Sequence, residues 1–278
     1  MKDIVLNQHA ILIDTEQEEI KPALLILPGG GYFALTDNEG IPVAQEFGKR
    51  GFHTFVLRYS TLETNPENCC FEQAMEDLLQ AVEYLRLHAD SLHLNGNIFL
   101  LGFSAGGHLA AMYGNSWRDL ARQRHMKADI LMIDGIVLGY PALNFSFISD
   151  QHLNGVPMEY RKRAEQFHCA VLMGLLHQKK MDRPKLDKLD ACNSINLDTP
   201  ATFVWGTLKD EIIRPSTLTK YAERMISTGR ECELHLYEGG THGMSLATQS
   251  TANNQNMINQ RISSWAGLAE GWMKEKMK

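Results

Sequence analysis

The chain has 278 residues and carries 27 Lys and Arg against 33 Asp and Glu, a net charge of −6. An acidic chain does not attract a polyanion, so nucleic acid is excluded as an expected partner. No apolar run reaches the length needed to cross a membrane, so a membrane-spanning protein is not expected. The length lies near the upper limit of one hydrophobic core, and we expect a single α/β domain over residues 1–278.

The first residues and the cysteines indicate a compartment. Polar residues interrupt the apolar stretch after Met1 before it reaches the length of a signal-peptide core. The five cysteines are odd in number and lack a Cys-x-x-Cys spacing, which is typical of a reducing compartment. We therefore expect a cytoplasmic protein, and the sequence leaves open whether it forms a homo-oligomer.

Short apolar or β-branched runs alternate with helical patterns, which predicts a mostly parallel sheet with helices on both faces. In chain order, strands are expected at residues 23–27, 52–59, 97–101, 135–140, 201–205 and 231–237. Apolar residues at helical spacing predict helices over 71–85 and 218–225. One further helix is predicted from an apolar face formed by Ile258, Ile262, Trp265, Leu268 and Trp272.

Residues 142–199 form a stretch that is too long for a plain connection between two strands. Its patterning is helical over 158–164 and 170–176, and the first of these segments carries a Lys/Arg run. We expect a helical insertion, or lid, over the active site. The basic run is interpreted as a solvated helix face.

The motif Gly102-Phe103-Ser104-Ala105-Gly106-Gly107 directly follows the strand expected at 97–101. It matches G-x-S-x-G, in which a serine occupies a strained turn between a strand and a helix with its hydroxyl exposed above the sheet. A simple Gly/Ser turn is the alternative. The strand before the motif and the helical pattern after it favour the nucleophile elbow, with Ser104 as the catalytic nucleophile.

A serine needs a general base within hydrogen-bond reach, and the base needs an acidic partner that fixes its tautomer. For a serine on such an elbow, the acid follows a later strand and the histidine follows the last strand. These positions are occupied by Asp210 and His242. Glu211 is the rival acid, and Asp210 is preferred because it begins the polar stretch before two isoleucines.

Other histidines compete with His242 for the role of base. His108 is close to Ser104 in sequence, but it lies on the helix after the elbow and is expected to point along that helix. His53 and His235 lie within strand patterns, where a satisfied structural histidine is the usual state.

The transition state of acyl transfer carries an oxyanion that preorganised N–H groups must meet. The glycines 29–31 follow the first expected strand, and the residue after the nucleophile supplies a further N–H. We expect an oxyanion hole formed by Gly30, Gly31 and Ala105. A phosphate-binding loop is the rival interpretation, and it is disfavoured because no Gly-Lys-Ser/Thr follows.

Pro28-Gly29-Gly30-Gly31-Tyr32, the elbow motif, Asp210 and His242 together resemble the α/β-hydrolase superfamily. More narrowly, the chain is similar to the acetyl-esterase/acetyl-xylan-esterase-like and hormone-sensitive-lipase-like esterases. The resemblance implies an α/β-hydrolase fold, with a mostly parallel central sheet flanked by helices and a helical insertion before the acid-bearing strand. Two positions depart from the lipase-like pattern. Pro28 replaces a histidine, and Phe103 stands where an acidic residue is usual, which favours the acetyl-esterase-like group.

We therefore expect a serine carboxylic-ester hydrolase that forms an acyl-enzyme on small, short-acyl esters. Acetyl esters are the first choice, including acetylated sugars and xylo-oligosaccharides. This chemistry needs neither a metal nor an organic cofactor. A serine peptidase of the same fold and a non-catalytic ligand-binding protein are the alternatives.

Overall fold

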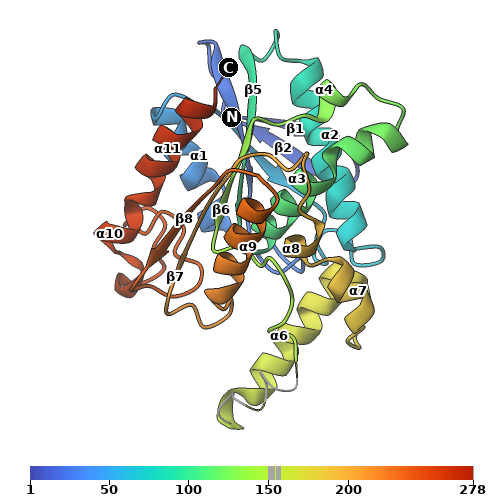
Figure 1. Ribbon diagram of the computed structural model, residues 1–278, viewed down its shortest axis with the longest axis vertical. Coiled ribbons are helices and arrows are strands. Elements are labelled where there is room, and N and C mark those ends of the chain that lie inside the picture. The colour runs from blue at the N-terminus through green and yellow to red at the C-terminus, as the bar shows by residue number, and fades with distance from the viewer. Residues whose placement is uncertain (150–153, 155–157, 278) are drawn as a thin grey trace.

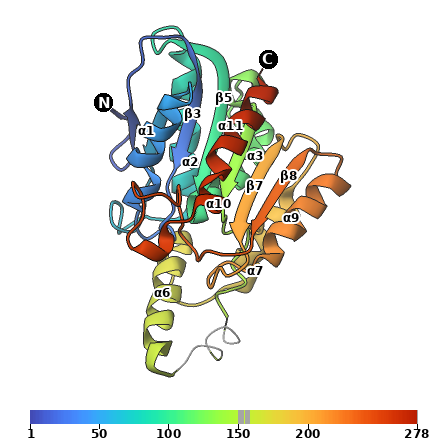
Figure 2. The ribbon, with the colours of Figure 1, turned by 90° about the vertical axis from the view of Figure 1, so that its left-hand side faces the viewer.

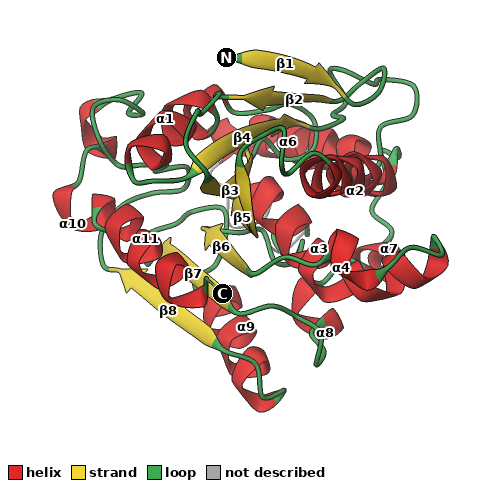
Figure 3. Cartoon of the chain, turned by 90° about the horizontal axis from the view of Figure 1, so that it is seen from above, coloured by secondary structure: helices red, strands yellow, loops and turns green. Residues whose placement is uncertain are grey.

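The structure is a computed structural model, and it describes residues 1–149, 154 and 158–277. Eight strands within these residues form one sheet of order β1-β2-β4-β3-β5-β6-β7-β8 (Figure 3). The strands are β1 (Lys2–Val5), β2 (Ile11–Asp14), β3 (Lys21–Leu27), β4 (His53–Arg58), β5 (Leu94–Phe103), β6 (Gly135–Gly139), β7 (Thr202–Thr207) and β8 (Cys232–Tyr237). The strands from β3 to β8 pair in parallel, so their carboxyl ends, which carry the loops of interest, lie along one edge of the sheet.

Helices cover both faces of this sheet (Figure 3). They are α1 (Ile41–Lys49), α2 (Phe71–Leu87), α3 (Ser104–Gln123), α4 (Ala128–Leu131), α6 (Met158–Leu176), α7 (Arg183–Lys188), α8 (Ala191–Ser194), α9 (Ser216–Ser227), α10 (Gln260–Ser263) and α11 (Trp265–Lys276), with single 3-10 turns η1 (Asp37–Glu39) and η2 (Gln255–Met257). Two hydrophobic clusters lie on opposite sides of the sheet, one beneath α2, α3 and α9 and the other beneath α1 and α11. The predicted mostly parallel sheet with helices on both faces is confirmed.

The first two strands, β1 and β2, were missed by the sequence patterns. They form an antiparallel hairpin, and β2 continues antiparallel onto β4 with Leu12 opposite Leu57. Each strand has four residues, and β2 ends in the buried acid Asp14, so the apolar signal is short and interrupted. Asp14 is tolerated there because its carboxylate accepts a 2.6 Å hydrogen bond from His53.

The C-terminal helix begins later than its apolar pattern suggests. The Asn259 side chain accepts hydrogen bonds from the amides of Arg261 and Ile262, which starts the helical segment at residue 260 and leaves Ile258 in extended backbone. Ile258 and Leu268 are 37% and 43% exposed, so the prediction that they belong to the packed face was wrong. Of the five predicted face residues, Ile262, Trp265 and Trp272 are buried.

The segment between β6 and β7 carries α6, α7 and α8, which agrees with the predicted helical insertion. Helix α6 projects from one end of the body (Figures 1 and 2). It spans both segments for which the sequence predicts helix, 158–164 and 170–176. Positions 150–153 and 155–157 of the predicted insertion lie outside the described residues. Among the helices that are described, none combines the length and apolar character required to cross a bilayer.

Candidate active site

The turn that carries Ser104 is tight, and the residues on either side of it must be glycines. Strand β5 ends at Phe103 and α3 begins at Ser104, whose φ is +47°, a strained value for a residue with a side chain. A Cβ on Gly102 would lie 2.4 Å from the carbonyl oxygen of Gly106, and a Cβ on Gly106 would lie 2.1 Å from that of Leu27. No side chain fits at either position, so the two flanking glycines are a packing requirement of the elbow.

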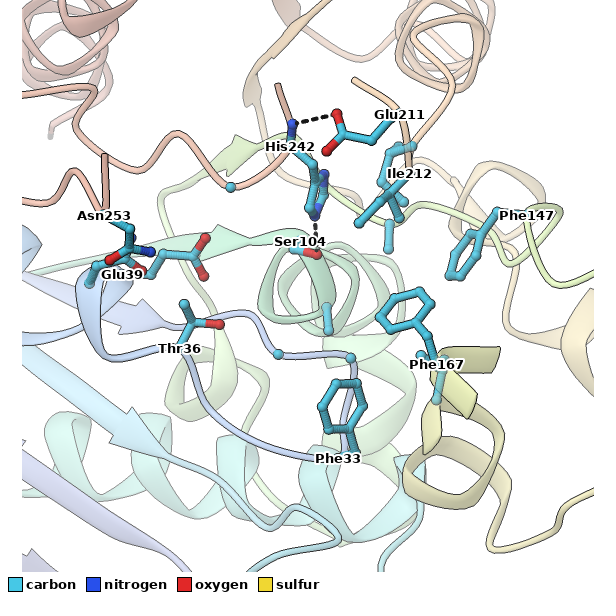
Figure 4. Close-up of a pocket in the computed structure, with 18 of the residues that line it drawn as sticks. Phe33, Thr36, Glu39, Ser104, Phe147, Phe167, Glu211, Ile212, His242 and Asn253 are labelled. Atoms are coloured by element: carbon cyan, nitrogen blue, oxygen red, sulfur yellow. Dashed lines mark hydrogen bonds between the residues drawn. The ribbon is translucent and has the colours of Figure 1, made fainter. Parts of the chain in front are cut away.

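Ser104, His242 and Asp210 lie in one hydrogen-bonded chain, although they come from three separate parts of the sequence. Figure 4 shows the bond between Ser104 and His242. The distance from Ser104 Oγ to His242 Nε2 is 2.9 Å, and that from His242 Nδ1 to Asp210 Oδ2 is 2.8 Å. An ionised carboxylate only accepts, so Nδ1 carries the hydrogen and Nε2 is left to accept the serine proton. The His242 and Asp210 side chains are 13% and 3% exposed, which shields this chain of bonds from water.

Asp210, and not its neighbour Glu211, faces the ring of His242. The second oxygen of Asp210, Oδ1, accepts from the amides of Ile212 and Ile213 at 2.9 and 2.7 Å, which fixes the carboxylate plane. Glu211 instead accepts from the backbone N–H of His242 at 3.2 Å (Figure 4). The structure therefore brings the preferred acid to the imidazole and gives the rival acid a contact with the histidine loop.

The three competing histidines have structural partners. His53 donates to Asp14 and contacts the Leu92 carbonyl, and its ring stacks on Phe55. His235 is bonded to Glu233 at 2.7 Å on the strand β8. His108 is fully buried in α3, where it accepts from the Tyr32 hydroxyl at 2.7 Å and donates to a carbonyl of the insertion. This arrangement holds His108 in its neutral form.

Burial lowers the pKa of His108 from its ordinary 6.5 to about 4, against the opposing effects of its backbone hydrogen bond and Asp190. The unfolded chain therefore binds a proton between pH 6.5 and 4 that the folded chain does not, and stability falls as pH falls through this window. On acidification through this window, the free energy of unfolding of the wild type decreases by up to about 1.4 kcal/mol per pH unit because of His108. We expect His108→Gln to abolish this contribution. Urea unfolding of both proteins at several pH values measures it, and parallel stability curves would contradict the assignment.

The glycine loop after β3 turns its amides outward. The carbonyls of Gly29 and Gly30 accept hydrogen bonds from the amides of Thr36 and Ala34, later in the same turn. In a trans peptide, the N–H points away from the carbonyl of the preceding residue, so the N–H groups of Gly30 and Gly31 point out of the turn. This conformation uses φ values of +122° and +62°, which favour glycine.

Ala105 brings a third amide to the same place. It lies in the first turn of α3, where an N–H has no carbonyl one turn earlier to bond to. Gly30, Gly31, Ala105 and Ser104 all line one cavity. The structure therefore places the three predicted oxyanion donors around the predicted nucleophile, and their catalytic roles stay predictions.

The cavity has a volume of about 610 Å³ and two chemically different sides (Figure 4). On one side, Phe33, Phe167 and Phe147 form an aromatic row with centroid separations of 6.1 Å, next to Ile212. The other side is polar and carries Thr36, Asn38, Glu39, Asn253 and Asn254. Because α6 supplies Phe167 and Arg163 to the lining, the insertion contributes to the wall beside Ser104.

Glu39 is a site residue that sequence analysis did not identify. It belongs to η1, is 2% exposed, and accepts hydrogen bonds from the Gly29 amide and the Tyr140 hydroxyl. Burial raises the pKa of its carboxyl, while these two hydrogen bonds and the charge of His242 act in the opposite direction. A single acidic residue between a glycine loop and a helix carries no motif, so only the folded chain indicates its place.

The parallel sheet, the elbow and the chain order serine, aspartate, histidine define a protein with the α/β-hydrolase fold. Within that class, the chain belongs to the BD-FAE family, whose model matches residues 10–225. Family and fold thus agree with the resemblance inferred from the glycine loop and the elbow motif.

The individual relatives share about a quarter of their aligned residues with this chain. The chain is 25% identical over 229 residues to endo-1,4-beta-xylanase B of Butyrivibrio fibrisolvens, covering 82% of this chain and 33% of that protein. It is 23% identical over 252 residues to the acetylxylan esterase of Xylanibacter ruminicola, covering 87% of this chain and 45% of that protein. The chain thus spans less than half the length of either curated relative. The crystal structure of the sugar hydrolase YeeB from Lactococcus lactis is similar over 99% of this chain and 97% of that chain, with 26% identity and a TM-score of 0.81.

Proposed function

We propose that this chain is a serine carboxylic-ester hydrolase that works through an acyl-enzyme on small, short-acyl esters, with acetyl esters, including those of sugars, as the first substrate class. The observation that carries the proposal is the bonded chain from Ser104 through His242 to Asp210. A serine with a hydrogen-bonded base, itself oriented by a buried carboxylate, is the arrangement that nucleophilic acyl transfer requires.

In the first half of the reaction, Ser104 Oγ attacks the ester carbonyl while His242 Nε2 takes its proton. The carbonyl oxygen becomes an oxyanion, and the N–H groups of Gly30, Gly31 and Ala105 stabilise it. Asp210 stabilises the imidazolium that forms. The C–O bond to the alcohol then breaks, the leaving oxygen takes the proton from His242, and the acyl group remains on Ser104.

In the second half, water repeats the attack on the acyl-enzyme. His242 takes a proton from water, the hydroxide adds to the acyl carbonyl, and the same amides hold the second oxyanion. The bond to Ser104 Oγ breaks and the serine regains its proton. The products are a carboxylic acid and the free enzyme, so the cycle needs nothing beyond the ester and water.

The sugar part of the proposal draws support from the polar side of the cavity. Thr36 and Asn253 offer side-chain donors and acceptors on the wall of the cavity that holds the nucleophile, which suits a polyhydroxylated alcohol. The name of the Xylanibacter ruminicola relative, an acetylxylan esterase, points to the same substrate class.

A labelling experiment combined with a substrate series tests the proposal. A fluorophosphonate probe is expected to modify the native chain at Ser104, as located by peptide mass spectrometry, and to leave the denatured chain unmodified. Initial rates are expected to fall from p-nitrophenyl acetate to the octanoate, with release of acetate from acetylated xylo-oligosaccharides. Faster cleavage of peptide p-nitroanilides would identify a peptidase instead. Absence of both an adduct and hydrolysis would indicate a non-catalytic binding protein.

A further inference from the structure

The carboxyl group of Glu39, on the polar side of the cavity, is hydrogen-bonded to two loops of the site. Its Oε2 accepts from the Gly29 amide at 2.7 Å, and its Oε1 accepts from the Tyr140 hydroxyl at 2.6 Å. Both oxygens are thus used by the protein, and the side chain is 2% exposed. A buried carboxylate is costly unless donors satisfy it, so these two contacts determine where the carboxylate lies.

A third donor fixes the direction of the hydrogen bond between the Tyr140 hydroxyl and Glu39. The backbone N–H of Ser245 donates to the Tyr140 hydroxyl oxygen at 2.8 Å, so the hydroxyl proton of Tyr140 is directed at Glu39. Ser245 follows His242 by three residues in the same loop. The Ser245 side chain donates to the carbonyl of Asn38, the neighbour of Glu39, which ties the histidine loop to η1 a second time.

Both ends of this network touch the reacting groups. The Tyr140 ring packs edge-on against the imidazole of His242, with centroids 5.1 Å apart and planes at 69°. At the other end, a Cβ on Gly29 would lie 2.8 Å from Glu39 Oε2 and 2.9 Å from Ser104 Cβ, so the glycine backbone is held between the carboxylate and the nucleophile. Because the Gly29 amide is bonded to Glu39, the free amides of the loop begin at Gly30.

We propose that Glu39 is a positioning residue for ester hydrolysis, which sets the oxyanion donors of Gly30 and Gly31 and the ring of His242 relative to Ser104. This role rests on the proposed function. The carboxylate acts through its two bonds, on Gly29 at the start of the glycine loop and on Tyr140 behind the imidazole. It thereby couples two loops that are far apart in the sequence.

Glu39→Gln is the sharpest test because it keeps the size of the side chain. An amide has one oxygen, so its NH2 group faces either the Gly29 N–H, where two donors oppose each other, or the Tyr140 hydroxyl, whose proton must then turn away from residue 39. Displacement of the glycine loop weakens the hydrogen bonds that stabilise the oxyanion of the transition state, and it leaves the binding of the substrate nearly unchanged. We therefore expect kcat on p-nitrophenyl acetate to fall about 100-fold, while KM changes less than about threefold.

Asp77→Asn is the matched control. Asp77 is also fully buried and accepts from a backbone amide, that of Ser60 at 2.7 Å, but it lies on α2 and does not line the cavity. It is expected to lower the melting temperature as Glu39→Gln does, and to leave kcat within about twofold of the wild type. If the kcat loss in Glu39→Gln is matched by Asp77→Asn, the effect is one of stability and the positioning role is wrong.

Tyr140→Phe provides the second variant if Glu39→Gln does not yield folded protein. It keeps the ring on His242 and removes only the hydroxyl between Glu39 and Ser245, and we expect a fall in kcat of about tenfold. If either variant folds and hydrolyses the ester with the kcat of the wild type, the positioning role is wrong and the proposed function still stands. A wild-type chain that hydrolyses no ester overturns the proposed function and this role with it.

Discussion

Ser104→Ala is expected to lower kcat for ester hydrolysis by a factor on the order of 10⁶, because the members of a nucleophile–base–acid unit act together. The variant retains the amides around the cavity, so binding persists and KM changes little. Steady-state rates on p-nitrophenyl acetate, corrected for hydrolysis in buffer, measure the effect. The melting temperature is expected to stay close to that of the wild type, since alanine keeps the same backbone turn and loses only one hydroxyl.

Ser116→Ala is the control for this substitution. Ser116 lies on the same helix α3, and its hydroxyl donates to the Met112 carbonyl within that helix. Its removal is expected to leave kcat unchanged. Retention of more than about one hundredth of wild-type kcat by Ser104→Ala would show that another group performs the attack.

The parallel sheet and the positions of Ser104, Asp210 and His242 were predictable because each residue follows a strand that the sequence pattern indicates. Strands β5 and β7 carry buried apolar runs, β8 alternates polar and apolar residues, and parallel strands present their carboxyl ends at one edge. The parallel arrangement of these strands therefore brings the three loops that follow them to the same edge of the sheet. The glycines of the elbow were equally visible, and the packing of Gly102 and Gly106 now gives their physical reason.

Other features depend on tertiary contacts that leave little trace in local patterns. Asp14 interrupts the apolar run of β2, and its burial makes sense only beside His53, 39 residues away. Ile258 fits a helical spacing, but the cap at Asn259 starts the helix after it. Glu39 is an ordinary acidic residue until the fold brings Tyr140, the residue after β6 and 101 positions later, into contact with it. Polar residues that pair across the fold carry no periodicity, so sequence patterns miss them.

The proposed role of Asp210 leads to the second large effect. In Asp210→Asn, the amide oxygen can keep the contacts with the Ile212 and Ile213 amides, which turns the NH2 group towards His242 Nδ1. Nδ1 must then accept, so the hydrogen moves to Nε2, and the imidazole no longer accepts the proton of Ser104. We expect kcat to fall by roughly 10⁴ with the fold intact.

Glu211→Gln separates this tautomer effect from a general loss of negative charge near the histidine. The Glu211 carboxylate accepts from the His242 backbone N–H, a contact that the oxygen of a glutamine side chain can replace. Its kcat is therefore expected to stay within about tenfold of the wild type, since one exposed hydrogen bond to a loop contributes little. Parallel measurement of kcat for both variants distinguishes the two acids. Equal losses would mean that charge rather than tautomer controls His242, because of the two acids Asp210 is the one bonded to Nδ1 of the ring.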